Sequence, residues 1–220
     1  MKKLFAFILA VSSVLCLFSC KNGKKTDYNV TKIGSYVVEE SELPTNYVRI
    51  VMKNGDAMLI ELYPDYAPIT VQNFKSLVLE NYYDGITFHR VIEGFMIQGG
   101  DPNGDGISNG DHPTIKGEFT ANGVDNPLSK SHERGVISMA RTNAPNSAST
   151  QFFIVHQTPA YPYPYNSLDG NYAAFGRLIA GFDVLDKIAT TATNAKNDKP
   201  LKAQTMAEVR FVNIVSGGER

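Results

Sequence analysis

From residue 47 onward the chain consists largely of short strand-like segments separated by turn residues, and this pattern restricts the folds it can adopt. Asn54-Gly55, a dipeptide typical of tight hairpin turns, separates the first two segments. Residues 71–80 and 182–191 instead have apolar side chains at helical spacing. Many short strands with two helices predict a mainly β fold, a barrel or sandwich with helices at its ends. The predicted strands are residues 47–52, 57–63, 87–92, 95–98, 135–140, 151–156, 173–178 and 208–215.

The first twenty residues have a different character. Lys2 and Lys3 precede an apolar run, residues 4–17, which suits the hydrophobic region of a signal peptide and is short for a membrane span. The run ends at Leu17-Phe18-Ser19-Cys20, which resembles the bacterial lipobox. The resemblance implies cleavage before Cys20, lipidation of Cys20 and attachment to a bacterial membrane, at its periplasmic or outer-membrane face. An ordinary secretory signal with an incidental cysteine is the alternative.

This interpretation divides the chain into a signal peptide (1–19), a lipidated cysteine with a polar tether (20–45) and a folded domain (46–220). The tether is predicted from its polar composition; a short extra strand around Tyr36-Val37-Val38 is the alternative. Cleavage would leave Cys20 as the sole cysteine, so we expect no internal disulfide. The net charge of −1 and the absence of a long basic block give no reason to expect nucleic acid as a partner. We expect a monomer.

Residues 98–112 contain two patterns that suggest other chemistry. Asp101-x-Asn103-x-Asp105-Gly106 resembles the first half of a calcium loop, but His112 stands where such a loop needs glutamate. Residues 106–110 spell G-x-S-x-G around Ser108, but no strand precedes and no helix follows that serine. The four histidines also lack the spacing of a zinc site. We expect solvated turn residues here and no metal.

The segment just before these patterns, residues 88–101 (FHRVIEGFMIQGGD), combines a guanidinium and an amide with apolar side chains. Because side chains alternate along a strand, Arg90, Met96 and Gln98 are predicted to share one face, with Phe95 at its edge. Such a face could bind a ligand. The alternative is a half-buried hairpin whose arginine pairs with a surface acid.

Three later segments complete a family pattern: residues 135–142 (GVISMART), 149–154 (STQFFI) and 167–177 (SLDGNYAAFGR). Together with residues 88–101 they resemble the cyclophilins, a family of peptidyl-prolyl cis-trans isomerases, from about Tyr47 to Val215. The MART form resembles the bacterial branch. The resemblance implies a closed eight-stranded antiparallel β-barrel capped by two α-helices, and rotation about X-Pro bonds without a cofactor or metal.

The resemblance also implies roles for individual residues. Arg90 matches the catalytic arginine, and Gln98 matches the side chain that holds the substrate backbone. Ala140 and Arg141 match the strand segment along which the peptide lies. The walls of the proline pocket are matched by Phe95, Met96, Phe153 and Leu168, although plain core packing is the alternative for Phe153 and Leu168. Tyr172 differs from the family pattern but is still expected to line the pocket.

Two positions depart from the family pattern. Tyr172 stands where many members have histidine, and Ser167 stands where the best-studied members have a tryptophan that contributes to cyclosporin binding, so cyclosporin sensitivity is not implied. The preceding residues 158–166 alternate Tyr and Pro and predict an extended backbone. They form either a rigid surface loop or a rim on the pocket in which a tyrosine replaces the missing indole.

The predicted function is that of a lipid-anchored isomerase that helps exported proteins fold, with proline-containing polypeptides as partners. A non-catalytic module that binds proline-containing peptides is the first alternative, and a calcium-stabilised surface protein is the second.

Overall fold

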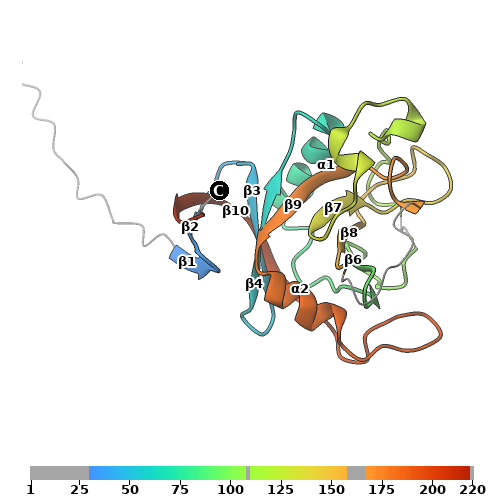
Figure 1. The fold of residues 1–220 in the computed structure, drawn as a ribbon. Coiled ribbons are helices and arrows are strands. Elements are labelled where there is room, and N and C mark those ends of the chain that lie inside the picture. Colours follow the sequence, from blue (N-terminus) through green and yellow to red (C-terminus); the bar gives the residue numbers. More distant parts are fainter. Residues whose placement is uncertain (1–29, 108–109, 158–166, 219–220) are drawn as a thin grey trace, which may run out of the picture.

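The computed structural model describes residues 30–107, 110–157 and 167–218 (Figure 1). Within them, every strand predicted from residue 47 onward is present, with bounds that differ by at most three residues. The strands are β1 (Val30–Ile33), β2 (Tyr36–Glu40), β3 (Tyr47–Met52), β4 (Ala57–Leu62), β5 (Arg90–Ile92), β6 (Met96–Gly99), β7 (Val136–Met139), β8 (Phe152–Val155), β9 (Ala174–Ala180) and β10 (Met206–Ser216). The helices are α1 (Pro68–Leu79), α2 (Phe182–Ala189) and the 3₁₀ turns η1 (Thr120–Asn122) and η2 (Pro127–Lys130).

The sheet differs from the closed eight-stranded barrel that was expected. The described residues contain ten strands in the order β1-β2-β10-β3-β4-β9-β7-β8-β6-β5, so β1 and β5 lie at the two ends. Residues just before β5 approach β10 only through a single bridge, Thr87 with Thr205, and through hydrogen bonds such as that from the Phe88 amide to the Gln204 carbonyl. The fold is therefore mainly β with two α-helices, but a closed barrel of eight strands is not confirmed.

An added hairpin accounts for the two extra strands. β1 and β2 pair with each other, and β2 continues the sheet along the second half of β10 (Figure 1). The prediction of a tether over 20–45 is therefore wrong for residues 30–40, where the alternative of an extra strand holds. Residues 20–29, including Cys20, lie outside the described part of the chain.

A buried arginine explains why such a polar segment is ordered. Arg49, on β3, is 3% exposed. Its guanidinium donates to Thr31 on β1 at 2.8 Å, to Glu40 on β2 at 3.2 Å and to Glu208 on β10 at 2.6 Å. A buried guanidinium needs such partners because the loss of its hydration is costly. The hairpin is thus fastened to the sheet by charge as well as by the burial of Ile33 and Val38.

The first helix begins three residues earlier than the apolar spacing predicts. Pro68 occupies the first helical turn, where its fixed φ suits the helix and no amide hydrogen is needed. The Glu118 carboxylate, from a distant loop, accepts hydrogen bonds from the backbone amides of Ile69 and Thr70. A cap supplied from 48 residues away leaves no local pattern in the sequence. No helix among the described residues has the length and apolar character needed to cross a bilayer.

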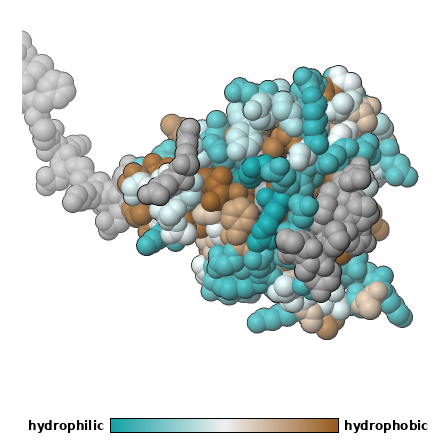
Figure 2. Space-filling view, in the orientation of Figure 1, coloured by the Kyte–Doolittle hydropathy of each residue, from teal (hydrophilic) through white to brown (hydrophobic). Residues whose placement is uncertain are grey.

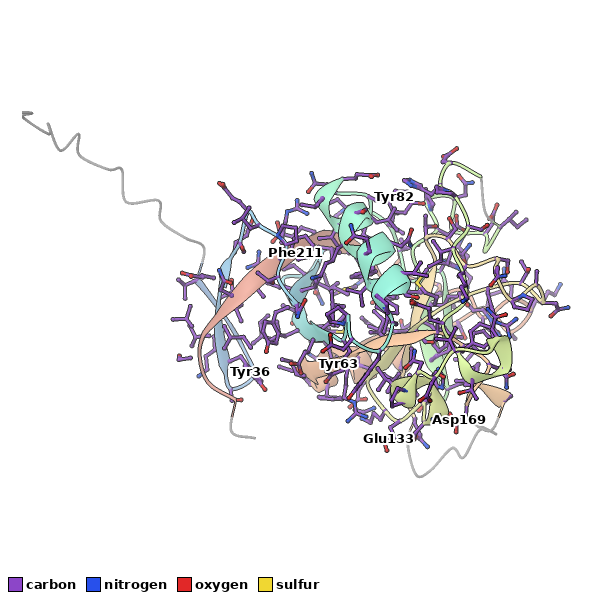
Figure 3. All side chains as sticks on the ribbon, turned by 90° about the horizontal axis from the view of Figure 1, so that it is seen from above. Tyr36, Tyr63, Tyr82, Glu133, Asp169 and Phe211 are labelled. Carbon is purple, nitrogen blue, oxygen red and sulfur yellow. The ribbon has the colours of Figure 1, made fainter. Side chains whose placement is uncertain are left out.

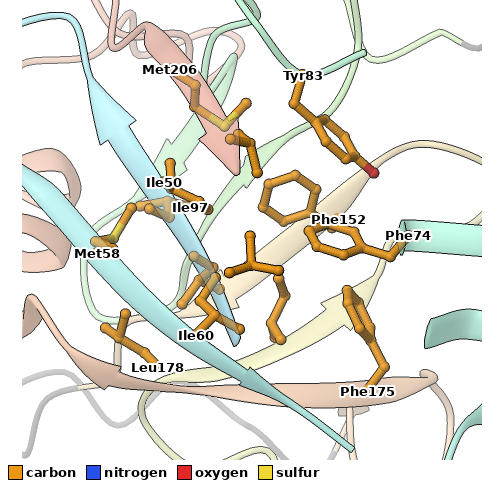
Figure 4. Packing of buried hydrophobic residues seen from close by; sticks show 14 of the residues in the cluster. Ile50, Met58, Ile60, Phe74, Tyr83, Ile97, Phe152, Phe175, Leu178 and Met206 are labelled. Atoms are coloured by element: carbon orange, nitrogen blue, oxygen red, sulfur yellow. The ribbon is translucent and has the colours of Figure 1, made fainter. Parts of the chain in front are cut away.

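Aromatic side chains fill the space between the sheet and α1 (Figure 4). Phe152, on β8, is fully buried, and its ring centroid lies 5.7 Å from Phe74 of α1, 5.3 Å from Tyr83 and 6.0 Å from Phe88. All three contacts are edge-to-face, a favoured aromatic geometry. This packing holds the inner face of the strands and leaves their outer face to form a second surface.

Candidate active site

The pairing of β5 with β6 brings polar and apolar side chains together on the outer face of the sheet. Arg90 lies opposite Gln98, and Ile92 lies opposite Met96. Between the strands, Gly94 adopts a φ of 76°, which favours glycine because it lacks a side chain. The prediction that Arg90, Met96 and Gln98 share one face is confirmed by this register. Gln98 is in turn opposite Phe153 of β8, which extends the same face.

A pocket of about 140 Å³ opens on this outer face. The chain brings to it every residue that the family resemblance assigned to catalysis or peptide binding. Its lining consists of Arg90, Phe95, Met96, Gln98, Ala140, Arg141, Phe153, Leu168 and Tyr172. Plain core packing was the alternative for Phe153 and Leu168. Each of these side chains is 4% exposed, and both line the pocket.

Arg90 is a half-exposed charged residue at this pocket. Its Nε donates to the Asp198 carboxylate at 3.3 Å, and the two side chains are 41% and 39% exposed. Its two terminal nitrogens have no hydrogen-bond acceptor among the described residues. The alternative prediction, that Arg90 pairs with a surface acid, is thus confirmed. The same arginine also lines the pocket, so the two interpretations hold together.

Gln98 and Arg141 are fixed by neighbours from other segments. The Gln98 side-chain amide donates to the Gln151 Oε1 at 2.9 Å. The Arg141 guanidinium lies over the Tyr172 ring at 4.7 Å and donates to the Asn171 carbonyl at 2.9 Å. Arg141 therefore holds the wall that carries Tyr172. A second hollow of about 120 Å³ continues along the same segment.

Behind the pocket, a buried histidine supports its aromatic wall. The His132 ring stacks on Phe153 at 6.2 Å, and Phe153 also meets Tyr172 edge-to-face at 5.6 Å. The ring nitrogens of His132 lie 3.1 Å from the Asp169 carboxylate and 3.2 Å from the Ser138 hydroxyl. Burial lowers the pKa of His132, although Asp169 opposes the shift.

This serine, histidine and aspartate superficially match a hydrolase triad, but their placement excludes that chemistry. Ser138 is completely buried on β7, so no substrate carbonyl can reach its hydroxyl. A triad requires an exposed serine beside a site for the substrate. The three groups instead connect Leu168, the neighbour of Asp169, with Phe153, the cross-strand partner of Ser138. They therefore brace two walls of the pocket.

The glycine-rich residues after β6 form a loop organised by one carboxylate. Asp101 accepts hydrogen bonds from the backbone amides of Asn103, Asp105 and Gly106 at 2.7–3.0 Å. Burial works against the charge, yet these donors lower the pKa of Asp101 below its ordinary value. The expectation of a solvated turn is wrong for Asp101, which is 2% exposed. It fits Asp105, which is exposed, while Ser108 lies outside the described residues.

The described residues contain no group of three or more His, Cys, Asp or Glu side chains suited to a metal ion. The Tyr/Pro segment 158–166, proposed above as a possible rim, lies outside the described part of the chain, directly before Ser167. The sequence did not single out three residues behind or beside the pocket: His132 and Asp198 contact the pocket residues Phe153 and Arg90, and Asp169 holds His132. Asp169 lies in a segment that matches the family, whereas nothing local marks Asp198, since it is 108 residues from Arg90.

Fold and pocket together define a cyclophilin-type protein. The family described as cyclophilin type peptidyl-prolyl cis-trans isomerase/CLD matches residues 47–211. A probable peptidyl-prolyl cis-trans isomerase of Brucella suis is 38% identical over 81% of this chain and 91% of its own length. Peptidyl-prolyl cis-trans isomerase B of Bacillus subtilis is 42% identical over 60% of this chain and 83% of its own length.

A solved structure agrees with these relatives. The crystal structure of a cyclophilin-type isomerase of Cryptosporidium parvum, in the presence of the dipeptide Ala-Pro, matches with a TM-score of 0.64 and 31% identity. The match covers 75% of this chain and 98% of that one. The chain belongs to the cyclophilin-type peptidyl-prolyl cis-trans isomerase family, and it is a peptidyl-prolyl cis-trans isomerase. Its hairpin β1–β2 lies outside the residues that the family match covers.

Proposed function

We propose that this isomerase acts on proline-containing segments of exported polypeptides and assists their folding, held at a bacterial membrane by lipid on Cys20. The observation that carries the catalytic part is the half-exposed Arg90 at the edge of an apolar pocket, where its two terminal nitrogens have no hydrogen-bond partner among the residues that the structure describes. The Ala-Pro dipeptide in the Cryptosporidium relative supports a proline-containing ligand. The apolar run before Cys20 supports export.

The proposed mechanism requires no nucleophile. Resonance gives the X-Pro bond double-bond character, and the barrier to rotation is about 18–20 kcal/mol. As the amide twists, that resonance is lost and the prolyl nitrogen becomes a better hydrogen-bond acceptor. The terminal nitrogens of Arg90 donate to that nitrogen, or to the carbonyl oxygen as it moves past. They therefore stabilise the twisted state more than either planar state.

The other pocket residues hold the substrate while the bond rotates. Phe95, Met96, Phe153, Leu168 and Tyr172 enclose the proline ring with apolar surface. Gln98 hydrogen-bonds to the peptide backbone, and the peptide lies along residues 140–141. Because arginine stays protonated at any working pH, Arg90 itself contributes little pH dependence.

An isomerisation assay on wild type and Arg90→Ala tests the catalytic assignment. We expect kcat/KM to fall by about 10²–10³-fold, the usual effect of removing one preorganised donor from a transition state. Peptide affinity, measured by titration, should change far less. A wild-type protein no faster than the uncatalysed reaction would instead favour the non-catalytic peptide-binding module.

The anchor is tested separately. Cys20→Ala should move the protein from the membrane fraction to the soluble exported fraction, because several acyl chains on one residue give stable attachment. Metabolic labelling with a fatty acid should mark the wild type and not the variant. A Cys20→Ala protein that remains labelled and membrane-bound would contradict the proposed anchor.

A further inference from the structure

The pairing of Arg90 with Asp198 has a specific geometry. The contact uses Nε, the innermost nitrogen of the guanidinium, at 3.3 Å from the Asp198 Oδ2. One terminal nitrogen of the planar group shares an edge with the Nε–H and the other points away from it, and the contact with Asp198 uses neither of these two nitrogens. Those are the atoms that the proposed function assigns to the twisting amide, and they have no other acceptor among the described residues.

Arg90 needs an external support because its own strand provides little. It lies at the start of the three-residue strand β5, which is an end strand of the sheet. A half-exposed arginine side chain has several rotatable bonds and loses much rotamer freedom when it is held in one position. Gln98, its cross-strand partner, donates to Gln151 instead. Asp198 is therefore the acceptor that holds Arg90 within the described structure.

Asp198 is itself fixed in place by the loop between α2 and β10. Its carbonyl accepts a hydrogen bond from the Val91 amide at 2.9 Å, beside Arg90, and its amide donates to the Asn194 carbonyl at 2.9 Å. Lys199, the next residue, donates to the Gly104 carbonyl at 2.7 Å and ties this loop to the loop after β6. Position 198 is thus held from both sides against the strand that carries Arg90.

The backbone conformation of Asp198 is unusual for a residue with a side chain. Its φ is 57°, and Asn81 is the other non-glycine residue with positive φ in the described part of the chain. Residues other than glycine enter this region at a steric cost, although Asp and Asn tolerate it best. Glycine would avoid the cost, so an aspartate there indicates that its side chain has a use.

We propose that Asp198 is a positioning residue for the isomerisation. It accepts a hydrogen bond from Arg90 Nε and thereby directs the terminal nitrogens of the guanidinium toward the X-Pro bond. The proposal deepens the function proposed above and depends on the assigned role of Arg90. Asp198 acts through Arg90 and touches no substrate.

The test compares Asp198→Gly with Asp198→Asn. Glycine suits the positive φ and removes the acceptor, whereas asparagine also tolerates that φ and keeps an oxygen that can accept from Nε without the charge. We expect Asp198→Gly to lower kcat by about tenfold, the value of a hydrogen bond to a charged group. Peptide affinity and melting temperature should stay close to wild type. Asp198→Asn should keep most of the activity.

Two controls separate this effect from other causes. Asn81→Gly relaxes the other positive φ, at the end of α1 and away from the pocket, and should leave activity unchanged. In an Arg90→Ala background, Asp198→Gly should cause no further loss, because residues that act through one group are not additive. A further loss there, unchanged activity of Asp198→Gly alone, or equal losses in Asp198→Gly and Asp198→Asn would overturn the proposal.

A structural measurement distinguishes failure of this proposal from failure of the Arg90 assignment. Hydrogen exchange of the Arg90 Nε–H, followed by NMR, should be slower in wild type and Asp198→Asn than in Asp198→Gly. If Arg90→Ala proves fully active while this difference is present, Asp198 holds Arg90 but the catalytic role of Arg90 is wrong. If exchange is the same in all three proteins, the positioning contact itself is absent.

Discussion

Strand β8 shows the difference between the two faces of the sheet. Its residues Phe152, Phe153, Ile154 and Val155 are all buried, so burial alone does not distinguish them. Phe152 points inward and packs against aromatic rings from α1 and the segment before β5. Phe153 points outward, where His132 and Tyr172 cover most of it and the pocket exposes the rest.

The comparison shows that two adjacent phenylalanines on one strand can serve separate purposes. The inner face is packed against other core side chains, so a substitution there lowers the free energy of unfolding. The outer face is covered by the segments 128–132 and 167–172, which leave the pocket open. Because side chains alternate along β8, Phe152 contributes to the stability of the core and Phe153 contributes to the pocket.

Replacing each phenylalanine by alanine should separate the two faces most clearly. Phe152→Ala should lower the free energy of unfolding by about 3–5 kcal/mol, because a large cavity opens inside the core. Phe153→Ala should cost about 1–3 kcal/mol, since its cavity adjoins the pocket. Its kcat/KM should fall by roughly 10–100-fold through loss of the apolar wall.

Denaturant titration and the isomerisation assay, applied to both variants, make the measurement. The folded fraction of Phe152→Ala should retain near-normal activity per molecule at low temperature. Equal stability losses, or a Phe153→Ala protein with full activity, would show that the two faces are not functionally distinct.

On the outer face, polar contacts should have smaller effects than the apolar wall. Gln98→Ala removes the proposed hydrogen bond to the peptide backbone and should lower kcat/KM by about three- to tenfold. Asp105→Ala changes an exposed residue of the following loop and should leave activity unchanged. The kinetic comparison of these two variants checks the assignment, and a larger effect from Asp105→Ala would contradict it.

Mild acid should destabilise the folded protein, in part through His132 behind the outer face. The pKa of His132 lies below the ordinary histidine value of 6.5 because burial disfavours its charged form, and the pKa values of His89 and His156 are lowered by burial as well. The unfolded chain therefore binds more protons than the folded protein as pH falls through 6.5. The free energy of unfolding should therefore be highest above that pH. It should decrease as the pH falls toward the lowered pKa values that these histidines have in the folded protein.

Thermal melts between about pH 7.5 and about pH 5 measure this dependence. His132→Gln, which keeps a polar side chain without a titrating ring, should show a shallower decrease than wild type. Asp101, whose pKa is also lowered, contributes only in stronger acid, because its ordinary value is 3.8. An identical slope in wild type and His132→Gln would mean that His132 is not the group responsible.

The strands and the pocket lining could be predicted because each depends on local patterns. Alternation and glycine turns place the strands from residue 47 onward, and the family segments carry the nine residues that meet at the pocket. The hairpin could not be predicted in the same way, since its polar residues are ordered by Arg49 from another strand. Asp198 and the Glu118 cap also act across long separations. The burial of Asp101 was missed because its partners are backbone amides.

The early start of the folded domain has a consequence for the proposed anchor. The first strand of the described residues, β1, begins at Val30 on the side of the molecule that carries Tyr36, and Asp169 beside the pocket lies on the far side (Figure 3). Apolar residues are visible on the surface where the hairpin meets the rest of the sheet (Figure 2).

With lipid on Cys20, ten residues would connect the membrane to β1, and a fully extended chain of that length reaches about 35 Å. The predicted tether of 26 residues would have reached roughly 90 Å. On the proposed anchor, the hairpin would therefore shorten the tether to less than half of its predicted length. The enzyme would then stay close to the bilayer surface, with its hairpin toward the lipid and its pocket toward polypeptides in the aqueous phase.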